Sequence, residues 1–553
     1  MADFETNNGL DESRVWAWAV YDGANYILGT DIKDFMQWCF TRRNSCRVWF
    51  HNLKHDGEFI IDYLLNNGFV WTKSAKTYKE FSTLITDTNV FYNIKIIKKN
   101  GKPLYFYDSF KLLAMSEAKI AETLHLPVQK GSIDYNAIRP VGYKPTEEEW
   151  SYIKDDVYIG YNGLKIFKEA KLNKMTIASN AMEDFKTHGD TNFIKKFLKP
   201  LSIEQDADIR KSYKGGFTYV NPIYKNKDIF KSGIVLDVNS LYPYVMKTKL
   251  LPYGPPVKYK GKYFENKSFP LYIQCIRCNF EIKPNRIPTL QIKNGYFNPT
   301  EYLTTSGDNP QLLLLTNVDL KLFLEQYNVY NLEYLYGYMF KGEHGIFDEY
   351  ITRWAKNKIE AKKEKNYGMY QISKIMQNSL YGKFGSNPVT IDKYPYLDEG
   401  GIVRYKCNEP EVKPKFYLPL ACFITSYARE HTIRAAQENY SRFLYSDTDS
   451  LHLLGDDIPV NIMCDDYELG AWKLESRFTR ARYVRSKTYI EYGYDLETGK
   501  KYKNVTCAGL PASCHKYVTW NNFKPGKVYY GKLMRKKVKG GVSLIESEFR
   551  IRE

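Results

Sequence analysis

The spacing of hydrophobic positions differs along the chain and predicts different secondary structure in different segments. An apolar run at 47–50 (RVWF) predicts a strand, and the following DGEFIIDYLLNNGF has apolar residues at helical spacing. A second helical pattern begins at 146 (TEEEWSYIKDDVYIGYNGLKIF). Residues 1–176 are therefore predicted to mix strands and helices, and a polar interval follows at about 184–212.

From YKGGFTYVN at 213 onward the pattern becomes strand-rich. GIVLDVNSLYPYVM (233–246) is an apolar strand followed by a turn, and residues 442–454 alternate apolar and polar on both sides of a turn, which predicts a hairpin. The interval 350–385 is long, basic and helical. The last forty residues place turn residues between short β-like runs. The fold class predicted is a multidomain chain with α/β and α+β parts.

The turn of the predicted hairpin, YSDTDS, carries Asp447 and Asp449. Aspartate is also common in turns because its side chain caps the local backbone. Asp237 ends the apolar strand at 233–246, however, and an acid there needs a partner. If that strand lies beside the hairpin, Asp237 and Asp449 converge, and divalent cations relieve their repulsion. Two such cations ~3.5–4 Å apart form a clamp for phosphoryl transfer.

The predicted helix at 369–385 has two different faces. Lys374, Asn378 and Tyr381 are spaced four and three apart and share one face, whereas the apolar residues between them fall on the other. The polar face offers a cation for a triphosphate, an amide and a ring on which a base can stack. The alternative is an ordinary amphipathic helix with a solvated lysine.

A second set of acids lies in the N-terminal third. Asp3 and Glu5 alternate onto one face of a strand, and Asp56 stands at the start of a helix. Tyr152 and Asp156 are four residues apart and share one helical face. Each of these acids, taken alone, is more often a surface residue or a helix cap. Together they suit a second two-metal site, in which water attacks a phosphodiester.

Composition narrows the class of protein. The 80 Lys+Arg exceed the 63 Asp+Glu by 17, and aromatic residues make up 16% of the chain. A polyanionic partner is plausible because basic grooves attract phosphate and rings stack on bases; a solvated basic surface is the alternative. The nine cysteines lack a regular framework, the N-terminus is polar, and no apolar stretch nears the ~20 residues of a membrane helix. We expect a soluble, reduced protein without a membrane partner.

Five motifs resemble those of family B DNA polymerases. DVNSLYP (237–243), KIMQNSLYG (374–382) and YSDTDS (445–450) are similar to motifs A, B and C in the right order, KTYI (487–490) to KxY, and YKGG (213–216) to YxGG. HNLKHDGEFI, RPVGYK, LPYG, TSYAR and CAGL extend the resemblance to protein-primed phage polymerases of the phi29 type. The resemblance implies a right-hand polymerase of palm, fingers and thumb behind an N-terminal DnaQ-like (RNase H-like) 3′–5′ exonuclease domain.

The resemblance also implies residue roles in the polymerase. Asp237, Val238 and Asp449 would hold two Mg²⁺ or Mn²⁺ ions, with Asp447 close by, and Tyr242 would be the steric gate against a 2′-hydroxyl. The nucleotide pocket would comprise Val238, Tyr242, Lys362, Lys374, Asn378 and Tyr381. The contacts to DNA would be Tyr213, Gly215, Gly216, Thr425, Arg429, Lys487 and Tyr489.

In the exonuclease, the resemblance implies two further ions. Asp3, Glu5, Asp56 and Asp156 would be the metal ligands, and Tyr152 would orient the attacking water. The single-strand path would be lined by Thr6, Asn52, Phe59, Ser109 and Tyr135. Asp3 follows only two residues, so the first strand is expected to be short. His55 stands where the family has an aromatic residue and Ser132 where it has an acid, while Lys130 is retained, so we expect altered handling of single strands.

The resemblance further implies domain limits and partners. The expected divisions are exonuclease 1–176, palm 177–248 and 412–507, terminal protein regions 249–349 and 386–411, fingers 350–385 and thumb 508–553. The first terminal protein region would contact the priming protein. The second would close a ring around DNA and separate the strands ahead of synthesis, which implies a processive, strand-displacing polymerase; fold-stabilising insertions are the alternative. The implied partners are primer-template DNA, dNTPs, single-stranded DNA and a terminal protein, bound by a monomer in the cytoplasm of an infected bacterial host. Two rival functions are a nuclease whose second half only holds DNA and a non-catalytic DNA-binding scaffold.

Overall fold

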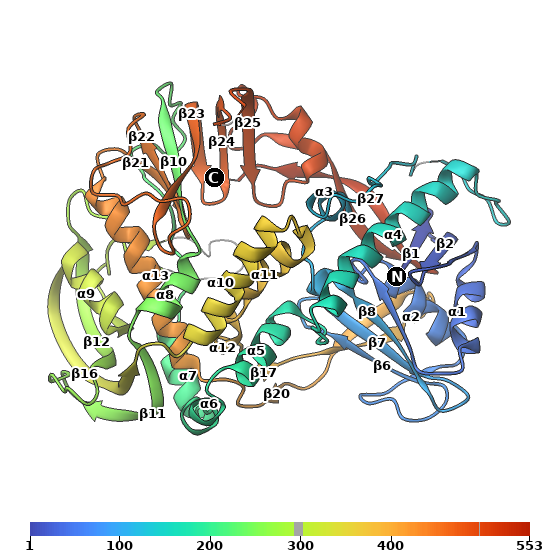
Figure 1. Cartoon of the computed structure of the whole chain (residues 1–553), viewed down its shortest axis with the longest axis horizontal. Coiled ribbons are helices and arrows are strands. Elements are labelled where there is room, and N and C mark those ends of the chain that lie inside the picture. Colours follow the sequence, from blue (N-terminus) through green and yellow to red (C-terminus); the bar gives the residue numbers. More distant parts are fainter. Residues whose placement is uncertain (136, 292–301, 497, 553) are drawn as a thin grey trace.

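The N-terminal region is built on two sheets, with helices packed around them. The computed structural model describes residues 1–135, 137–291, 302–496 and 498–552 (Figure 1). One sheet has the order β1-β2-β3 and the other β4-β8-β7-β6-β5, with β4 and β8 parallel. The strands are β1 Ala2–Thr6, β2 Val15–Tyr21, β3 Tyr26–Gly29, β4 Cys46–Phe50, β5 Val70–Trp71, β6 Glu80–Ile85, β7 Phe91–Ile97 and β8 Pro103–Asp108. The helices are α1 Ile32–Thr41, α2 Asp56–Asn66, α3 Glu117–Thr123 and α4 Glu147–Glu169.

The predicted strand at 47–50 and the helix that follows it are confirmed, and α2 begins at Asp56. The helix predicted from 146 is also confirmed, because Thr146 and Glu149 form a capping box at the start of α4. The polar interval at about 184–212, for which no elements were predicted, is largely helical. Its helices are α5 Ile177–His188, α6 Thr191–Phe197 and α7 Ile203–Ile209.

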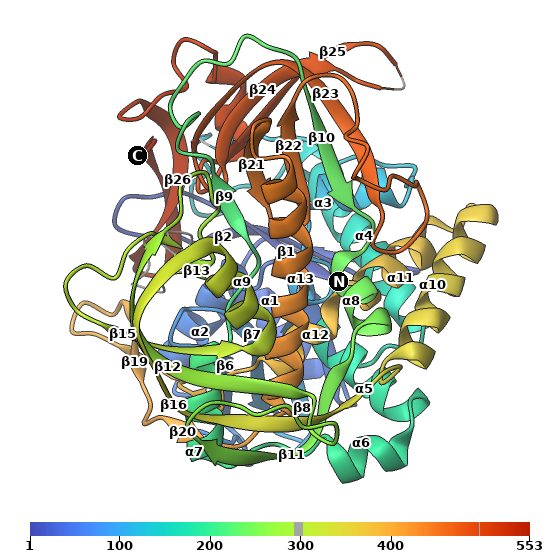
Figure 2. The ribbon, with the colours of Figure 1, turned by 90° about the vertical axis from the view of Figure 1, so that its left-hand side faces the viewer.

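A seven-stranded antiparallel sheet lies at the centre of the second part of the chain, in the order β25-β24-β23-β10-β22-β21-β9. The predicted hairpin at 442–454 is confirmed as β21 and β22. Helix α13 runs from this sheet down to the sheet that contains β11, β12 and β16 (Figure 2). The elements are β9 Thr218–Val220, β10 Gly233–Val238, α8 Leu241–Thr248, α13 Leu418–Glu438, β21 Phe443–Asp447, β22 Ser450–Leu454, β23 Trp472–Arg485, β24 Thr488–Tyr494 and β25 Lys501–Cys507.

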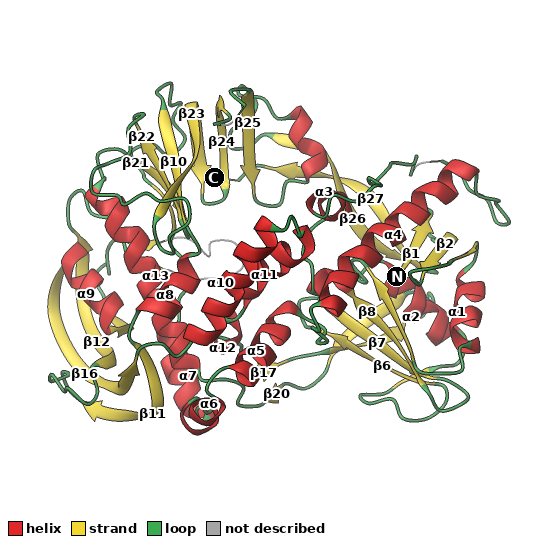
Figure 3. Ribbon diagram, viewed as in Figure 1, coloured by secondary structure: helices red, strands yellow, loops and turns green. Residues whose placement is uncertain are grey.

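Two insertions interrupt the strands of this central sheet (Figure 3). The first folds into the sheet β11-β16-β12-β15 with helix α9, and its residues 292–301 lie outside the described residues. The second consists of two short ribbons. The elements of the first are β11 Leu251–Lys260, β12 Leu271–Ile282, β13 Leu290–Gln291, β14 Tyr302–Leu303, β15 Gln311–Thr316, α9 Asn317–Gln326 and β16 Tyr327–Glu343. Those of the second are β17 Val389–Thr390, β18 Lys393–Leu397, β19 Val403–Cys407 and β20 Glu411–Val412.

The helical interval predicted at 350–385 is divided into α10 (Asp348–Lys363), α11 (Tyr367–Ser379) and α12 (Tyr381–Phe384). The first break falls at Lys365, whose φ of 54° leaves the helical region, and the Asn366 side chain then caps α11 by accepting from the Met369 N–H. The chain therefore reverses between α10 and α11. None of the described helices is long and apolar enough to span a bilayer.

The C-terminal hairpin, β26 (Val528–Val538) and β27 (Gly541–Arg550), reaches across to the N-terminal region (Figure 1). Val542 belongs to the same apolar core as the N-terminal sheets. Glu58 of α2 accepts from Lys537 Nζ of β26 at 3.0 Å and from the Tyr405 hydroxyl of β19 at 2.9 Å. The Glu58 side chain is 6% exposed. One buried carboxylate thus joins three segments that are far apart in the sequence.

Replacing Lys537 should destabilise this junction strongly. Lys537→Met leaves the Glu58 carboxylate buried without its cation, which costs about 3–5 kcal/mol. We expect faster proteolysis of the C-terminal hairpin and a lower thermal unfolding midpoint. Lys527→Met, at an exposed position just before the same strand, is the control, and equal behaviour of the two variants would contradict the assignment.

Candidate active sites

Asp237 and Asp449 are brought together by the order of the central sheet. Strand β10 lies between β22 and β23, and Asp237 of β10 pairs with Ser450 of β22. The Val238 N–H donates to the Asp449 carbonyl at 2.8 Å, and the Asp449 N–H donates to the Asp447 carbonyl at 2.7 Å. The predicted adjacency of strand and hairpin is confirmed, and the two acids extend from one edge of a rigid sheet.

The electrostatics of this edge favour a cation. Burial, followed by repulsion from Asp449 and Glu475, raises the pKa of Asp237 to about 8, while Lys374 lowers it. Burial likewise raises the pKa of Asp449 to about 6, with repulsion from Asp447 and Glu475 adding to it. Carboxylates that resist ionisation in this way become ionised when a divalent ion enters.

Glu475 is a third acid that the sequence analysis missed. The register of β23 against β10 shifts between Val235 and Leu236, which face Ser476 and Leu474. Glu475 is the extra residue of this bulge, and its charge acts on both Asp237 and Asp449. A bulge has no reliable sequence signal, so only the structure shows that this exposed acid belongs to the site.

Asp447 differs from its neighbours because its charge is already paired. Lys487 Nζ donates to both of its carboxylate oxygens, at 2.8 and 2.7 Å, and the Thr218 hydroxyl donates at 3.1 Å. The sequence analysis expected Lys487 to contact DNA. Its ammonium is instead engaged by Asp447, although half of the side chain remains exposed.

Two tyrosines and several lysines lie around the same edge. The rings of Tyr242 and Tyr381 stack at 3.9 Å and 16°. Lys374 and Asn378 are exposed on α11, as predicted from their spacing. Lys362 is exposed near the end of α10.

Lys358 is a further cation that sequence reasoning missed. Burial lowers its pKa, and Lys374 and Lys362 lower it further, so three ammonium groups converge. It precedes Lys362 by four residues, one helical turn, which is the signal that could have identified it.

Two of the expected DNA contacts are buried in this structure. Thr425 and Arg429 are each 2% exposed. The Arg429 guanidinium donates to both Asp319 oxygens and to the carbonyls of Lys214 and Gly215. Arg429 therefore fixes the YKGG segment, and contact of either residue with DNA stays a prediction.

The remaining expected contacts lie close to the acids. A Cβ on Gly216 would stand 2.7 Å from the Thr448 hydroxyl, so glycine allows this segment to pack against the acidic turn. Gly215 is exposed and Tyr213 is half-buried. Tyr489 packs against the rings of Tyr445 and Tyr483.

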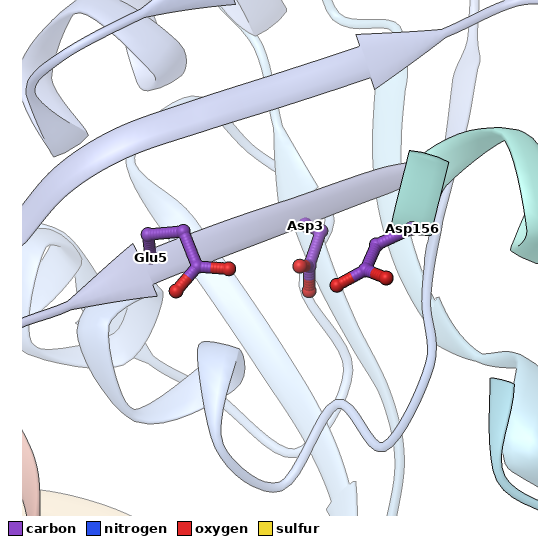
Figure 4. A group of neighbouring side chains, drawn as sticks. All are labelled: Asp3, Glu5 and Asp156. Carbon is purple, nitrogen blue, oxygen red and sulfur yellow. The ribbon is translucent and has the colours of Figure 1, made fainter. Parts of the chain in front are cut away.

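The N-terminal acids form a second cluster (Figure 4). Asp3 and Glu5 of β1 and Asp156 of α4 each offer one oxygen, and these atoms lie within 4.8 Å of one another. The predicted shared faces are confirmed, and β1 is short, as expected, with its five residues all paired to β2. Asp56 lies outside this group of three, but its charge acts on Asp3, and one of its oxygens is buried without a hydrogen-bond partner.

Burial is the main cause of the pKa shifts in this cluster. It raises the pKa of Glu5 to about 8, of Asp56 to about 8 and of Asp156 to about 7, and that of Asp3 well above its usual range. Repulsion among the acids adds to each shift. The Tyr152 hydroxyl lies 2.7 Å from that of Tyr135, at the edge of the same cluster.

The expected single-strand path is open only in part. Asn52 and Tyr135 are exposed, and the Thr6 hydroxyl lies 3.1 Å from His55 Nε2. Phe59 and Ser109 are 1% and 3% exposed, so both are buried in this structure, and their contact with a single strand stays a prediction. Phe59 is covered by the C-terminal hairpin, where a Cβ on Gly541 would approach its ring to 2.5 Å.

Metal-free protein should lose stability as the pH rises. The folded-state pKa of Asp237, Glu5 and Asp56 is about 8, whereas these acids titrate near 4 when unfolded. The raised pKa values of these acids therefore increase the free energy of unfolding below about pH 4, and this contribution is lost as the pH rises toward 8. Thermal unfolding in EDTA should show this decline, and Mg²⁺ should reduce it.

Asp237→Asn should raise the metal-free stability at pH 8 by on the order of 2 kcal/mol, discounting the shift for solvent screening. The exposed Asp457, which pairs with Arg442 at 3.0 Å, supplies the control Asp457→Asn. A stability that is flat with pH in EDTA would contradict the clustering of the acids.

Comparison with known proteins gives one consistent result. A family model described as DNA polymerase type B, organellar and viral, matches residues 39–145 and 139–465. The chain is 42% identical to the DNA polymerase of Bacillus phage B103 over 100% of this chain and 99% of that one, and 40% identical to that of Bacillus phage phi29 over 100% and 98%.

Solved structures give the same answer. Phi29 DNA polymerase complexed with primer-template DNA matches with a TM-score of 0.94 and 40% identity, over 100% of this chain and 99% of that chain. The complex of the same protein with primer-template DNA and incoming nucleotide substrates matches with a TM-score of 0.92, also at 40% identity over 100% and 99%. The chain therefore belongs to the protein-primed family B DNA polymerases of the phi29 type, which carry a 3′–5′ exonuclease domain.

Proposed function

We propose that Asp237, Val238 and Asp449 hold two divalent ions, Mg²⁺ or Mn²⁺, in the polymerase site. The observation that carries this proposal is the convergence of Asp237 and Asp449 at one sheet edge, where the Val238 N–H donates to the Asp449 carbonyl at 2.8 Å. Burial raises the pKa of both acids, which agrees with it. Oxygen ligands of this kind suit both ions. When bound, the ions supply activation of the primer 3′-hydroxyl and neutralise charge on the leaving group. Asp447, paired with Lys487, is not a ligand and instead fixes the turn.

The nucleotide would lie between the sheet edge and α11. Tyr242, stacked on Tyr381, forms the wall that leaves no room for a 2′-hydroxyl. Lys374, Lys362 and Lys358 form the triphosphate contact, because their charges converge beside the acids. Asn378 supplies a polar contact from the same helix face.

The N-terminal cluster would cleave a mispaired 3′ end. Asp3, Glu5 and Asp156, with Asp56, hold two divalent ions, and Tyr152 orients the attacking water. Asn52, Thr6 and Tyr135 contact the single strand. Phe59 joins this path only if the C-terminal hairpin moves, and Ser109 joins it only if its hydroxyl leaves the Phe50 carbonyl and His51.

The partners proposed follow from the relatives. Structures of Phi29 DNA polymerase hold primer-template DNA, single-stranded DNA or incoming nucleotides, and we propose the same three partners here. A terminal protein would bind the insertion at 249–349, while the insertion at 386–411 and the C-terminal hairpin close a ring around DNA. The remaining divisions are exonuclease 1–176, palm 177–248 and 412–507, fingers 350–385 and thumb 508–553. The chain would act as a monomer in the cytoplasm of an infected bacterium.

A labelled primer on a longer template tests both sites at once. With Mg²⁺ and dNTPs the primer should lengthen, and without dNTPs it should shorten. Asp449→Ala should lower extension by about 10³-fold or more, because metal activation supplies several kcal/mol, and should leave shortening intact. Asp156→Ala should do the reverse. Extension by Asp449→Ala at the parent rate would refute the polymerase site, and absence of both reactions in the parent would favour a DNA-binding scaffold.

Lys358 can be tested apart from the metal ligands. Lys358→Met should raise the KM for dNTPs about tenfold, the effect of losing about 1.4 kcal/mol of binding, with a smaller effect on kcat. Lys356→Met removes an exposed lysine of the same helix that pairs with Glu360 and is the matched control. Equal KM values for the two variants would exclude Lys358 from the triphosphate site.

A further inference from the structure

We propose that Glu117 is a positioning residue of the exonuclease site, which holds the Lys130 ammonium and thereby keeps Asp156 available to a divalent ion. Glu117 is the first residue of α3, follows the Ser116 cap and is 11% exposed in its side chain. It belongs to none of the motifs discussed above. The inference rests on the proposed metal site of Asp3, Glu5 and Asp156.

Lys130 lies between two carboxylates. Its Nζ donates to Glu117 Oε2 at 2.6 Å and to Asp156 Oδ2 at 2.5 Å. It also lies over the Tyr152 ring, 5.2 Å from its centre. One ammonium thus touches a proposed metal ligand, the proposed water-orienting tyrosine and Glu117.

The ammonium and a divalent ion compete for Asp156. The second oxygen of Asp156 is buried without a hydrogen-bond partner, so this carboxylate faces the cluster with Lys130 as its main counter-charge. A divalent ion that binds Asp156 repels Lys130. Because Glu117 remains paired with the ammonium, Lys130 can separate from Asp156 without becoming a buried, unpaired cation, which would cost free energy.

Glu117 also adds negative charge to the site. Its carboxylate lies 2.6 Å from the same ammonium that pairs with Asp156, so it stands beside the cluster of Asp3, Glu5 and Asp156. A negative charge beside a cation site attracts the cation. Retention of Lys130 and addition of negative charge both predict that loss of Glu117 weakens ion binding.

The test measures ion binding directly, apart from catalysis. The full chain carries Asp237→Asn and Asp449→Asn, so that the polymerase site does not take up the ion, and Mn²⁺ binding is followed by electron paramagnetic resonance. Glu117→Gln, which removes the charge but keeps the size, should raise the Kd for Mn²⁺ about tenfold. Glu117→Asp should recover part of the affinity.

Two further variants keep the result interpretable. Glu122→Gln, which removes an exposed acid of the same helix paired with Lys119, should bind Mn²⁺ as the parent does. Asp156→Asn should abolish binding at this site. In the exonuclease assay, Glu117→Gln should raise the Mg²⁺ concentration for half-maximal rate by the same factor and leave the rate at saturating Mg²⁺ within about threefold of the parent.

The outcomes separate the two proposals. An unchanged Kd in Glu117→Gln, with Asp156→Asn still losing Mn²⁺, would overturn the role of Glu117 and keep the metal site. A lower rate at saturating Mg²⁺ with an unchanged Kd would also overturn it. Equal Mn²⁺ binding by the parent and Asp156→Asn would overturn the exonuclease metal site and this inference with it.

Discussion

Repulsion between buried carboxylates is the constraint on which both active sites depend. Asp237 and Asp449 lie at one edge of the central sheet, and burial together with repulsion from neighbouring acids raises the pKa of each. Such groups stay close only when a rigid backbone holds them. The central sheet supplies that backbone in one site, and strand β1 with helix α4 supplies it in the other. Cations from neighbouring segments pair with these acids: Lys487, between β23 and β24 of the same sheet, pairs with Asp447, and Lys130, which precedes α4, pairs with Asp156.

A buried acid paired with a cation from a distant part of the sequence also joins the two ends of the chain. Glu58 of α2 accepts from Lys537 of the C-terminal hairpin and from Tyr405 of the second insertion, and the Lys537 ammonium lies 3.8 Å from the centre of the Tyr405 ring. Breaking a buried ion pair costs more free energy than the intact pair contributes to stability. We therefore expect the three segments to come apart in a single step. The N-terminal region is consequently the surface against which the C-terminal hairpin is held.

Sequence reasoning succeeded where the required geometry is local. The positions of Asp237 at a strand end and of Asp449 in a hairpin turn follow from alternation and turn residues, which set register within a few residues. That this strand lies beside the hairpin is a contact between distant parts of the chain, which the structure supplies. Glu475 and Glu117 could not be found this way, because one depends on a bulge and the other on a lysine 13 residues away in the chain. A motif identifies a residue type but not its burial, as Arg429 and Phe59 show, because both side chains are covered by segments from other parts of the chain.

The two sites differ in how much negative charge the protein itself supplies. A nucleoside triphosphate brings several negative charges of its own, so the polymerase site needs few carboxylates. One of its acids, Asp447, is neutralised by pairing with Lys487. A phosphodiester brings only one charge, and the exonuclease cluster adds Asp56 and Glu117 to its three converging acids. With ions at the proposed sites, we expect the exonuclease cluster to bind them largely through the charge of the protein, before the strand arrives, and the polymerase site to bind them together with the nucleotide.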